Sequence, residues 1–214
     1  MLSMGLSKQI DEIISATRGT TLVAATKYVE ANTLLQLLAK GINNFGENRV
    51  DSFLKKYDAL KSHEEICWHF IGTLQTNKVA KMINKITYLH SLNSIKLARY
   101  IERYRLTPLK CFIEVNFYDS NKTGVSKEEA LSLLKAINNY KNVEVIGLMT
   151  MTEQEFTDSE KQLTFKMLND FKNELNRMGY NKITCLSMGM SDDYKFAIKE
   201  HSTHVRLGRI LFEL

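Results

Sequence analysis

The feature that most constrains the fold is a repeated alternation of short strand-like runs with longer helix-like segments. The runs are rich in apolar and β-branched residues, and the segments between them have the spacing of amphipathic helices. The runs are Leu22–Thr26, Ile42–Phe45, Trp68–Ile71, Thr87–His90, Lys110–Asn116, Val143–Met149, Ile183–Leu186 and Thr203–Leu207. Because parallel strands need a crossover connection, usually a helix, this alternation predicts a parallel sheet.

Eight strands alternating with helices match the count of a single (β/α)8 TIM-type barrel, and 214 residues lie at the compact end of its usual size. An open doubly wound sheet is the alternative. With Pro108 as the only proline and no low-complexity linker, we expect one domain over residues 1–214. An extra N-terminal helix within residues 1–13 is expected to cap the bottom of the barrel.

Several helices carry their own start and stop signals. Val50 to Leu60 places its apolar residues on one face, and Ser126 followed by Glu129 is a capping box. Asn93 is expected to cap the next amphipathic stretch after Thr87–His90. Gly179 is well placed to end a long helix in the left-handed conformation.

Composition excludes several classes of protein. With 44% apolar and 25% charged residues, the chain is not disordered as a whole. No segment approaches the ~18 consecutive apolar residues of a membrane span. The net charge of +5 comes from scattered side chains, which suits solubility better than nucleic-acid binding. Three cysteines without a CxxC pair indicate reduced core thiols, no metal site and a cytoplasmic protein.

Lys27 directly follows the first predicted strand and, by two-residue alternation, shares a face with Val23 and Ala25. If that face lines the barrel interior, Lys27 points into the mouth at the carboxyl ends of the strands, where barrel active sites lie. Apolar surroundings lower the pKa of a lysine, which makes its amine a nucleophile toward an aldehyde. A lysine that simply reaches water is the other interpretation.

Two glycine-containing turns follow the last two strands, in Ser187–Asp193 and Arg206–Arg209. Glycine lets the backbone approach a ligand, helix starts present free N–H groups, and phosphate sites in barrels are often built from these loops. A phosphate anchor and an amine thus face one opening. Asp192 and Asp193 would repel a phosphate, so this assignment requires them to face away from it.

Seven strings of residues, running in order from about residue 20 to 212, resemble the pyridoxal phosphate homeostasis protein family. They are Ala25–Lys27, Phe45–Arg49, Trp68–Lys78, Lys122–Gly124, Gly147–Met149, Leu186–Asp193 and Val205–Gly208. The second-longest and the longest, Leu186–Asp193 and Trp68–Lys78, are the most specific. The resemblance implies a barrel like the N-terminal domain of alanine racemase.

The resemblance also implies a site for pyridoxal 5′-phosphate (PLP). Lys27 would hold the cofactor as an internal aldimine, and Ser191 with the backbone N–H groups of Gly208 and Arg209 would hold its phosphate. Arg206 would lie against the pyridine nitrogen, where its fixed charge keeps that nitrogen unprotonated and weakens the ring as an electron sink. Asn48 and Met190 would contact the ring or its substituents.

A further residue and three departures from the family pattern leave questions open. His69 either lies beneath the cofactor or is a hydrogen-bonded core histidine. Arg209 stands where a smaller or uncharged residue is common, and His201 replaces a frequent glycine. The sequence ends at Leu214, where relatives usually continue, so the sealing around the last strand is in question.

The resemblance implies a carrier that holds PLP, limits free aldehyde in vitamin B6 homeostasis and passes the cofactor to apo-enzymes. The alternative is a PLP-dependent amino-acid racemase. Racemisation needs two acid–base groups on opposite faces of the substrate carbon, and the barrel consumes the residues that a second domain would need. A third hypothesis is a barrel for another phosphorylated metabolite. We expect a monomer, with no nucleic-acid or membrane partner, because nothing in the helices demands a dimer.

Overall fold

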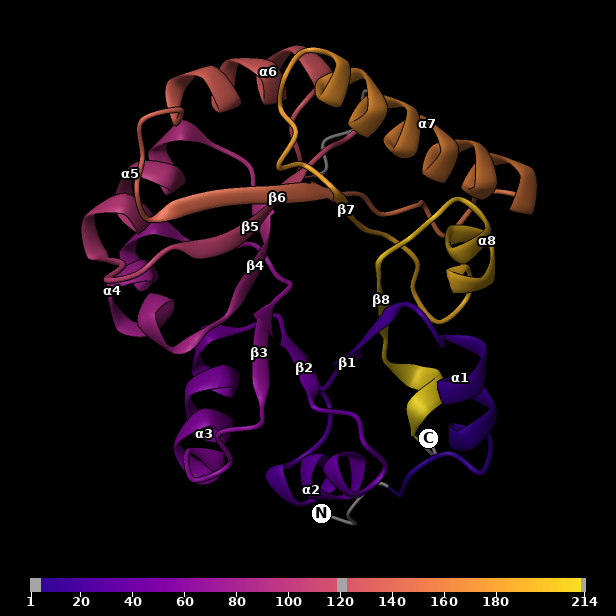
Figure 1. Ribbon diagram of the computed structural model, residues 1–214. Helices are drawn as coiled ribbons and strands as arrows, with labels where there is room; N and C mark the ends of the chain where they lie inside the picture. Colours follow the sequence, from indigo (N-terminus) through magenta and orange to yellow (C-terminus); the bar gives the residue numbers. More distant parts are fainter. Residues whose placement is uncertain (1–4, 119–122, 213–214) are drawn as a thin grey trace.

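Eight parallel strands close into a barrel inside a ring of helices (Figure 1). The computed structural model describes residues 5–118 and 123–212. The strands are β1 (Thr21–Ala25), β2 (Asn44–Glu47), β3 (Cys67–Phe70), β4 (Tyr88–Leu92), β5 (Leu109–Glu114), β6 (Val143–Met149), β7 (Cys185–Ser187) and β8 (His204–Leu207). All eight predicted strands are confirmed, each within two residues of its expected bounds, and the barrel excludes the open sheet.

The helices follow the strands around the outside of the barrel (Figure 1). They are α1 (Ile10–Ala16), α2 (Ala31–Ala39), α3 (Val50–Leu60), α4 (Val79–Met82), α5 (Ile95–Tyr104), α6 (Lys127–Ala136), α7 (Asp158–Arg177) and α8 (Tyr194–Lys199), with the 3-10 turns η1 (Thr76–Lys78), η2 (Ile83–Lys85) and η3 (Arg209–Leu211). Phenylalanine and aliphatic side chains from strands and helices form the core between the two layers, with Phe45, Phe53 and Phe70 fully buried.

The capping signals read from the sequence are confirmed with one exception. Ser126 and Glu129 form a capping box at α6, and Gly179 adopts φ +96° just after α7. The cap of α5 is Ser94, whose hydroxyl accepts a hydrogen bond from the Leu97 backbone N–H. The assignment of this cap to Asn93 is wrong by one residue, because the first turn begins at Ile95 and brings the Ser94 hydroxyl to the free N–H.

The N-terminal helix lies in the outer ring, between α8 and α2, and not across the bottom of the barrel as expected (Figure 1). The backbone N–H of Ser7 donates to the Leu211 carbonyl at 2.9 Å. The Asp11 carboxylate pairs with the Lys40 ammonium, just past α2, at 2.9 Å. The helix buries Ile10 and Ile13 against this flank, because these apolar residues find their partners beside η3.

The last strand is sealed. Strand β8 pairs with β1 from Thr21–His204 to Ala24–Leu207, and all four β8 residues are buried. The doubt raised by the end of the sequence is therefore resolved for this strand. Lys122, part of one family string, and the terminal Leu214 lie outside the described residues.

Candidate functional site

A cavity of about 440 Å³ opens at the carboxyl ends of the strands. Of the seven residues predicted to bind the cofactor, six line it: Lys27, Met190, Ser191, Arg206, Gly208 and Arg209. They come from the ends of β1, β7 and β8, which the barrel brings side by side. Asn48 is the exception, since it is exposed just past β2 and is not among the residues that line the cavity.

Lys27 projects into this cavity from a turn just after β1. Val23 and Ala25 do face the barrel interior, as the alternation predicts: a side chain on Gly46 would lie 3.0 Å from Val23, and Ala25 lines the cavity. The Lys27 side chain itself is solvent-exposed, with its Nζ 4.5 Å from the centre of the exposed Tyr28 ring. The expectation of apolar surroundings for this amine is wrong, because the cavity is open and partly polar at this point.

The loops after β7 and β8 meet through a hydrogen bond. The Gly208 backbone N–H donates to the Ser191 hydroxyl at 3.2 Å. The loop after β7 turns sharply at Gly189, which has φ +95° and packs so closely on α8 that an added Cβ would lie 2.6 Å from the Ala197 Cβ. A hydroxyl and a backbone N–H therefore sit together on the wall of the cavity, as a phosphate site requires.

The two neighbouring aspartates are both engaged within this loop region. Asp193 is buried and accepts hydrogen bonds from the Met190 backbone N–H at 2.6 Å and the Thr152 hydroxyl at 2.5 Å. Asp192 forms an ion pair with the Arg209 guanidinium. Both residues line the cavity, so the requirement that they face away from it is not met. Their charges are instead compensated by donors of the protein. The Arg209 side chain is therefore partly exposed to solvent and pairs with Asp192.

Arg206 is held rigidly inside the mouth of the barrel. Its Nη1 donates to the Ser187 hydroxyl at 2.6 Å and to the Ser187 carbonyl at 2.8 Å, and its Nη2 donates to the Thr150 carbonyl at 3.0 Å. Burial lowers the pKa of this guanidinium to about 10, while Asp193 and Glu114 act to raise it. The group therefore remains positively charged at neutral pH, and its direction is fixed by three hydrogen bonds.

A chain of buried hydrogen bonds runs from Arg206 into the barrel. The Ser187 hydroxyl lies 2.7 Å from His90 Nδ1, His90 Nε2 lies 2.9 Å from His69 Nδ1, and His69 Nε2 lies 3.0 Å from Asn44 Oδ1. Burial holds the pKa of both histidines well below the usual value, so both rings are neutral. His69 is a hydrogen-bonded core histidine, and it reaches Arg206 through His90 and Ser187.

The direction of this chain follows from its end members. Arg206 can only donate, so the Ser187 hydroxyl accepts from it and gives its own proton to His90 Nδ1. His90 then carries its proton on Nε2 and donates to His69, which in turn donates from its own Nε2 to Asn44. Every hydrogen bond of this series therefore donates in the same direction, from the mouth toward the interior. Neither Ser187 nor His90 was predicted as a site residue: Ser187 is the last residue of β7, and His90 lies in the middle of β4, and both are fully buried.

A second buried network supports the turn that carries Lys27. Lys56 Nζ lies 2.5 Å from Glu47 Oε1 and donates to the Thr26 carbonyl, also at 2.5 Å. The Thr26 and Ser52 hydroxyls donate to the same carboxylate. Glu47 and Lys56 are buried between β2 and α3. The sequence signal was weak: a lone lysine among the apolar positions of the α3 stripe.

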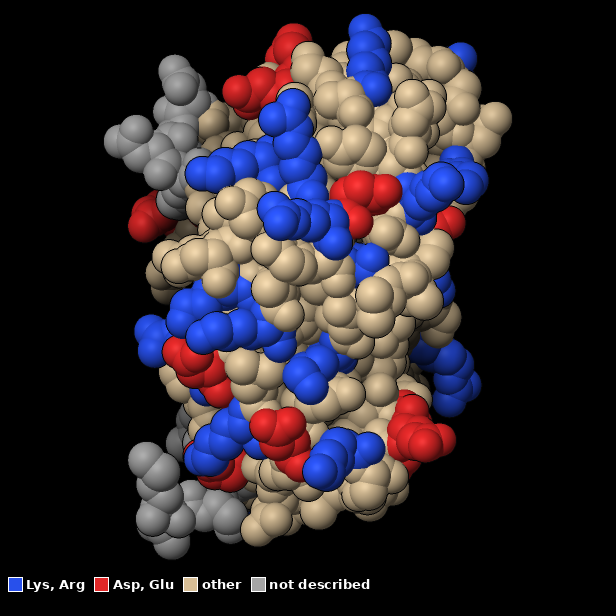
Figure 2. Space-filling model, turned by 90° about the vertical axis from the view of Figure 1, so that its left-hand side faces the viewer, with Lys and Arg blue, Asp and Glu red and all other residues tan. Residues whose placement is uncertain are grey.

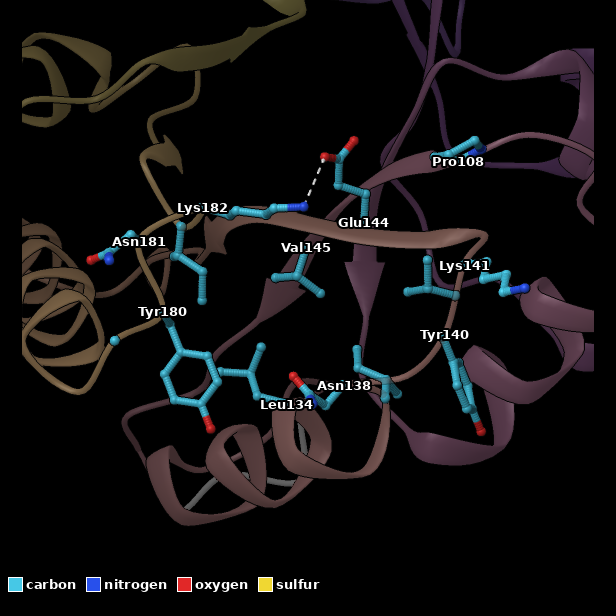
Figure 3. Close-up of a pocket in the computed structure, with 14 residues that line it drawn as sticks. Pro108, Leu134, Asn138, Tyr140, Lys141, Glu144, Val145, Tyr180, Asn181 and Lys182 are labelled. Carbon is cyan, nitrogen blue, oxygen red and sulfur yellow. Dashed lines mark ion pairs between the residues drawn. The ribbon is translucent and has the colours of Figure 1, made fainter.

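Another concave region, drawn in Figure 3, lies at the amino ends of β5, β6 and β7, at the end of the barrel opposite the mouth. It has a volume of about 410 Å³ between α6 and the start of β6. Tyr140 and Tyr180 stand at its two sides, and Lys182 reaches toward Glu144 at 4.0 Å along its rim (Figure 3). It contains none of the predicted cofactor residues, so the chemistry expected from the sequence gathers at the mouth.

Other features of the described residues bear on the remaining predictions. All three cysteines are unpaired; Cys111 is fully buried, and Cys67 and Cys185 are half-buried. Over residues 5–118 and 123–212, no group of three or more His, Cys, Asp and Glu side chains is arranged to hold a metal, and no helix is apolar and long enough to span a membrane. Acidic side chains lie between basic ones on the face shown in Figure 2.

Comparison with known proteins identifies the family. Residues 6–214 match the model of the alanine racemase N-terminal domain. The chain is 36% identical over 195 residues to a pyridoxal phosphate homeostasis protein of Synechocystis, covering 89% of each protein. It is 37% identical over 195 residues to one of Aquifex aeolicus, covering 89% of this chain and 85% of that one.

A solved structure supports the same assignment. PipY of Synechococcus elongatus, with PLP bound, superimposes with a TM-score of 0.89 at 29% identity, over 96% of this chain and 100% of that one. The barrel fold, the order of the family strings along the sequence and the similarity to these relatives all indicate the same family. The chain belongs to the pyridoxal phosphate homeostasis protein family, within the alanine racemase N-terminal domain fold.

Proposed function

We propose that this protein binds pyridoxal 5′-phosphate at the mouth of its barrel and acts as a carrier and regulator in vitamin B6 homeostasis. The observation that carries the proposal is that Lys27, Arg206 and the Ser191–Gly208 junction line one cavity. Its volume of about 440 Å³ lies in the range of small-ligand pockets, which is roughly 300–1,000 Å³. The names of the relatives and the PLP in PipY support the same ligand.

The residues present fit this cofactor. Lys27 supplies an amine that can condense with the aldehyde, with release of water, and its exposure leaves it accessible to exchange. The Ser191 hydroxyl and the backbone of Gly208 and Arg209 would hold the phosphate, while Met190 would contact the ring. When bound, PLP supplies a reactive aldehyde and an electron-withdrawing ring. Arg206, fixed by Ser187 and Thr150, would present a permanent positive charge to the ring nitrogen.

We further propose that the protein has no catalytic turnover of its own and that apo-enzymes receive the cofactor from it. A cationic guanidinium against the ring nitrogen disfavours protonation of that nitrogen and so discourages carbanion chemistry. The open cavity beside Lys27 suits exchange with incoming amines. We place the protein in the cytoplasm as a monomer, a location that its unpaired cysteines support.

The decisive experiment is an absorbance spectrum of the protein with PLP, before and after borohydride reduction, followed by mapping of the modified peptide. We expect a visible band that reduction removes, with the label on Lys27. Lys27→Ala should remove the band and leave the fold intact, while Lys161→Ala, at another lysine of the same cavity, should leave it unchanged. A label on another lysine would overturn the assignment.

Two further measurements separate the function classes. Arg206→Ala and Ser191→Ala should each weaken cofactor retention in equilibrium dialysis, and unchanged retention in both would contradict the site. Incubation of the loaded protein with alanine or serine enantiomers should give no racemisation above the rate of free PLP. Rapid racemisation would instead place the protein among the enzymes.

A further inference from the structure

A second, smaller chamber adjoins the cavity at Lys27. It has a volume of about 240 Å³ and shares Thr152, Glu153 and Met190 with that cavity. Its inner wall is Glu114, the last residue of β5, and its other walls include Tyr118 and Met151. A group bound there lies beside the ligand of the larger cavity.

The Glu114 carboxylate is buried, and one of its two oxygens lacks a hydrogen bond of normal length. The residue is 3% exposed, and its Oε1 accepts a hydrogen bond from the Thr123 hydroxyl at 2.7 Å. Its Oε2 is buried and has no hydrogen bond of normal length within the described part of the chain. Since an unsatisfied buried carboxylate costs free energy, this oxygen marks a place where a donor from outside would be bound favourably.

The nearby guanidinium does not fill this role. Arg206 is directed to Ser187 and Thr150 by its three hydrogen bonds, and it acts on Glu114 through its charge without a direct bond. Burial raises the pKa of the Glu114 carboxyl, against the lowering effects of the Thr123 hydrogen bond, the Arg206 charge and a weaker hydrogen bond from the Asn93 side chain. The carboxyl is thus poised to gain from a donor that carries a positive charge.

The chamber walls favour a small cation over a neutral or acidic group. Among the described residues that line it, Glu114 supplies a buried carboxylate, and none is basic. The Tyr118 ring is held in place by its hydroxyl, 2.6 Å from the Thr164 hydroxyl, and by the edge of Phe156 at 4.8 Å. A fixed aromatic ring and a buried carboxylate are both attractive to an ammonium group.

We propose that the Glu114 chamber binds the ammonium group of a small primary amine, next to the cavity that holds Lys27. The thioethers of Met151 and Met190 and the Tyr118 ring accommodate a short aliphatic body. This inference rests on the proposed function for its meaning, because the amine would then be held beside the cavity proposed for the cofactor. Binding of the amine itself does not require the cofactor.

The test is calorimetric titration of the cofactor-free protein with propylammonium, with butyrate and 1-butanol as the anionic and neutral probes. We expect saturable binding of propylammonium alone, weakened about tenfold or more by Glu114→Gln. Glu64→Gln removes an exposed carboxylate and is the matched control, expected to bind as the native protein does. Glu114→Asp keeps the charge and should retain a preference for the cation.

Circular dichroism first establishes that each variant is folded. If Glu114→Gln does not fold, two comparisons of binding affinity still test the inference. One compares the native protein with Glu114→Asp, and the other compares propylammonium with 1-butanol. Equal binding of all three probes, no saturable binding by the native protein, or undiminished binding by folded Glu114→Gln would overturn the inference. A colourless PLP-treated protein would instead refute the proposed function, so the two failures are distinguishable.

Discussion

The Lys56 ammonium lies 2.5 Å from the Glu47 carboxylate, and both side chains are buried. Each forms a hydrogen bond with Thr26, the residue before Lys27. Removing one partner of a buried ion pair leaves an uncompensated charge. We expect Lys56→Met to lower the free energy of unfolding by about 3–5 kcal/mol, measured by urea denaturation.

Neighbouring Lys55 provides the matched control, since it pairs with Glu30 at 3.0 Å on the exposed surface. Lys55→Met should leave the urea midpoint unchanged, because exposed pairs contribute little. The double variant Lys56→Met with Glu47→Leu should recover part of the loss. If the Lys55 and Lys56 substitutions lowered the free energy of unfolding equally, the buried pair would contribute no more to stability than the exposed one.

His201 adopts φ +66°, the only non-glycine residue with positive φ in the described chain, just after α8. This explains why glycine is expected at the position: a side chain is strained in the left-handed region. His201→Gly should therefore raise the free energy of unfolding by about 1 kcal/mol, seen as a higher melting temperature. His201→Ala keeps a Cβ and should gain less; a loss of stability with glycine would contradict this reading.

Because three buried histidines line the inside of the barrel, we expect the free energy of unfolding to fall in mild acid. Burial lowers the pKa of His69 and His90 well below 6.5, and lowers that of His204 to about 4. Below pH 6.5 these histidines bind protons in the unfolded chain but not in the folded barrel. Their contribution to the free energy of unfolding is therefore complete above pH 6.5 and is lost as the pH falls toward 4.

For His204 alone the loss amounts to about 3 kcal/mol across this window. Glu114 works in the opposite sense because burial raises its pKa, so the series is best repeated in Glu114→Gln. Urea denaturation at several pH values checks the slope. His63→Gln, at a more exposed histidine, should leave it unchanged, and a flat profile between pH 6.5 and 4 would refute the prediction.

The hydrogen-bond chain fixes the tautomers of two histidines. At pH 7, His69 and His90 should both carry their proton on Nε2, which ¹⁵N-resolved NMR of the imidazole rings reports directly. Ser187→Ala removes the hydroxyl between Arg206 and His90, so the His90 Nδ1 signal should shift most. The half-buried His63 ring, which is outside this hydrogen-bond chain, should not respond. A proton on Nδ1 of either buried ring would show that the chain runs otherwise.

The strands were predictable because each is a short apolar run between amphipathic helices, a pattern local to a few residues. The carboxyl-end placement of Lys27, Ser191, Arg206 and Gly208 followed from the barrel itself. What escaped prediction depends on pairs distant in sequence. The partner of Lys56 and the exposure of Lys27 are set by packing between elements, and the cap of α5 at Ser94 depends on where the first turn begins.

The position of α1 beside η3 has a consequence for how the barrel assembles. The Ser7–Leu211 hydrogen bond and the β1–β8 pairing join residues almost a full chain length apart. Such contacts bear the largest loop-closure entropy and form slowly. The seam between the first and last strands is therefore expected to acquire native structure late, so weakening it should mainly speed unfolding and change the refolding rate little.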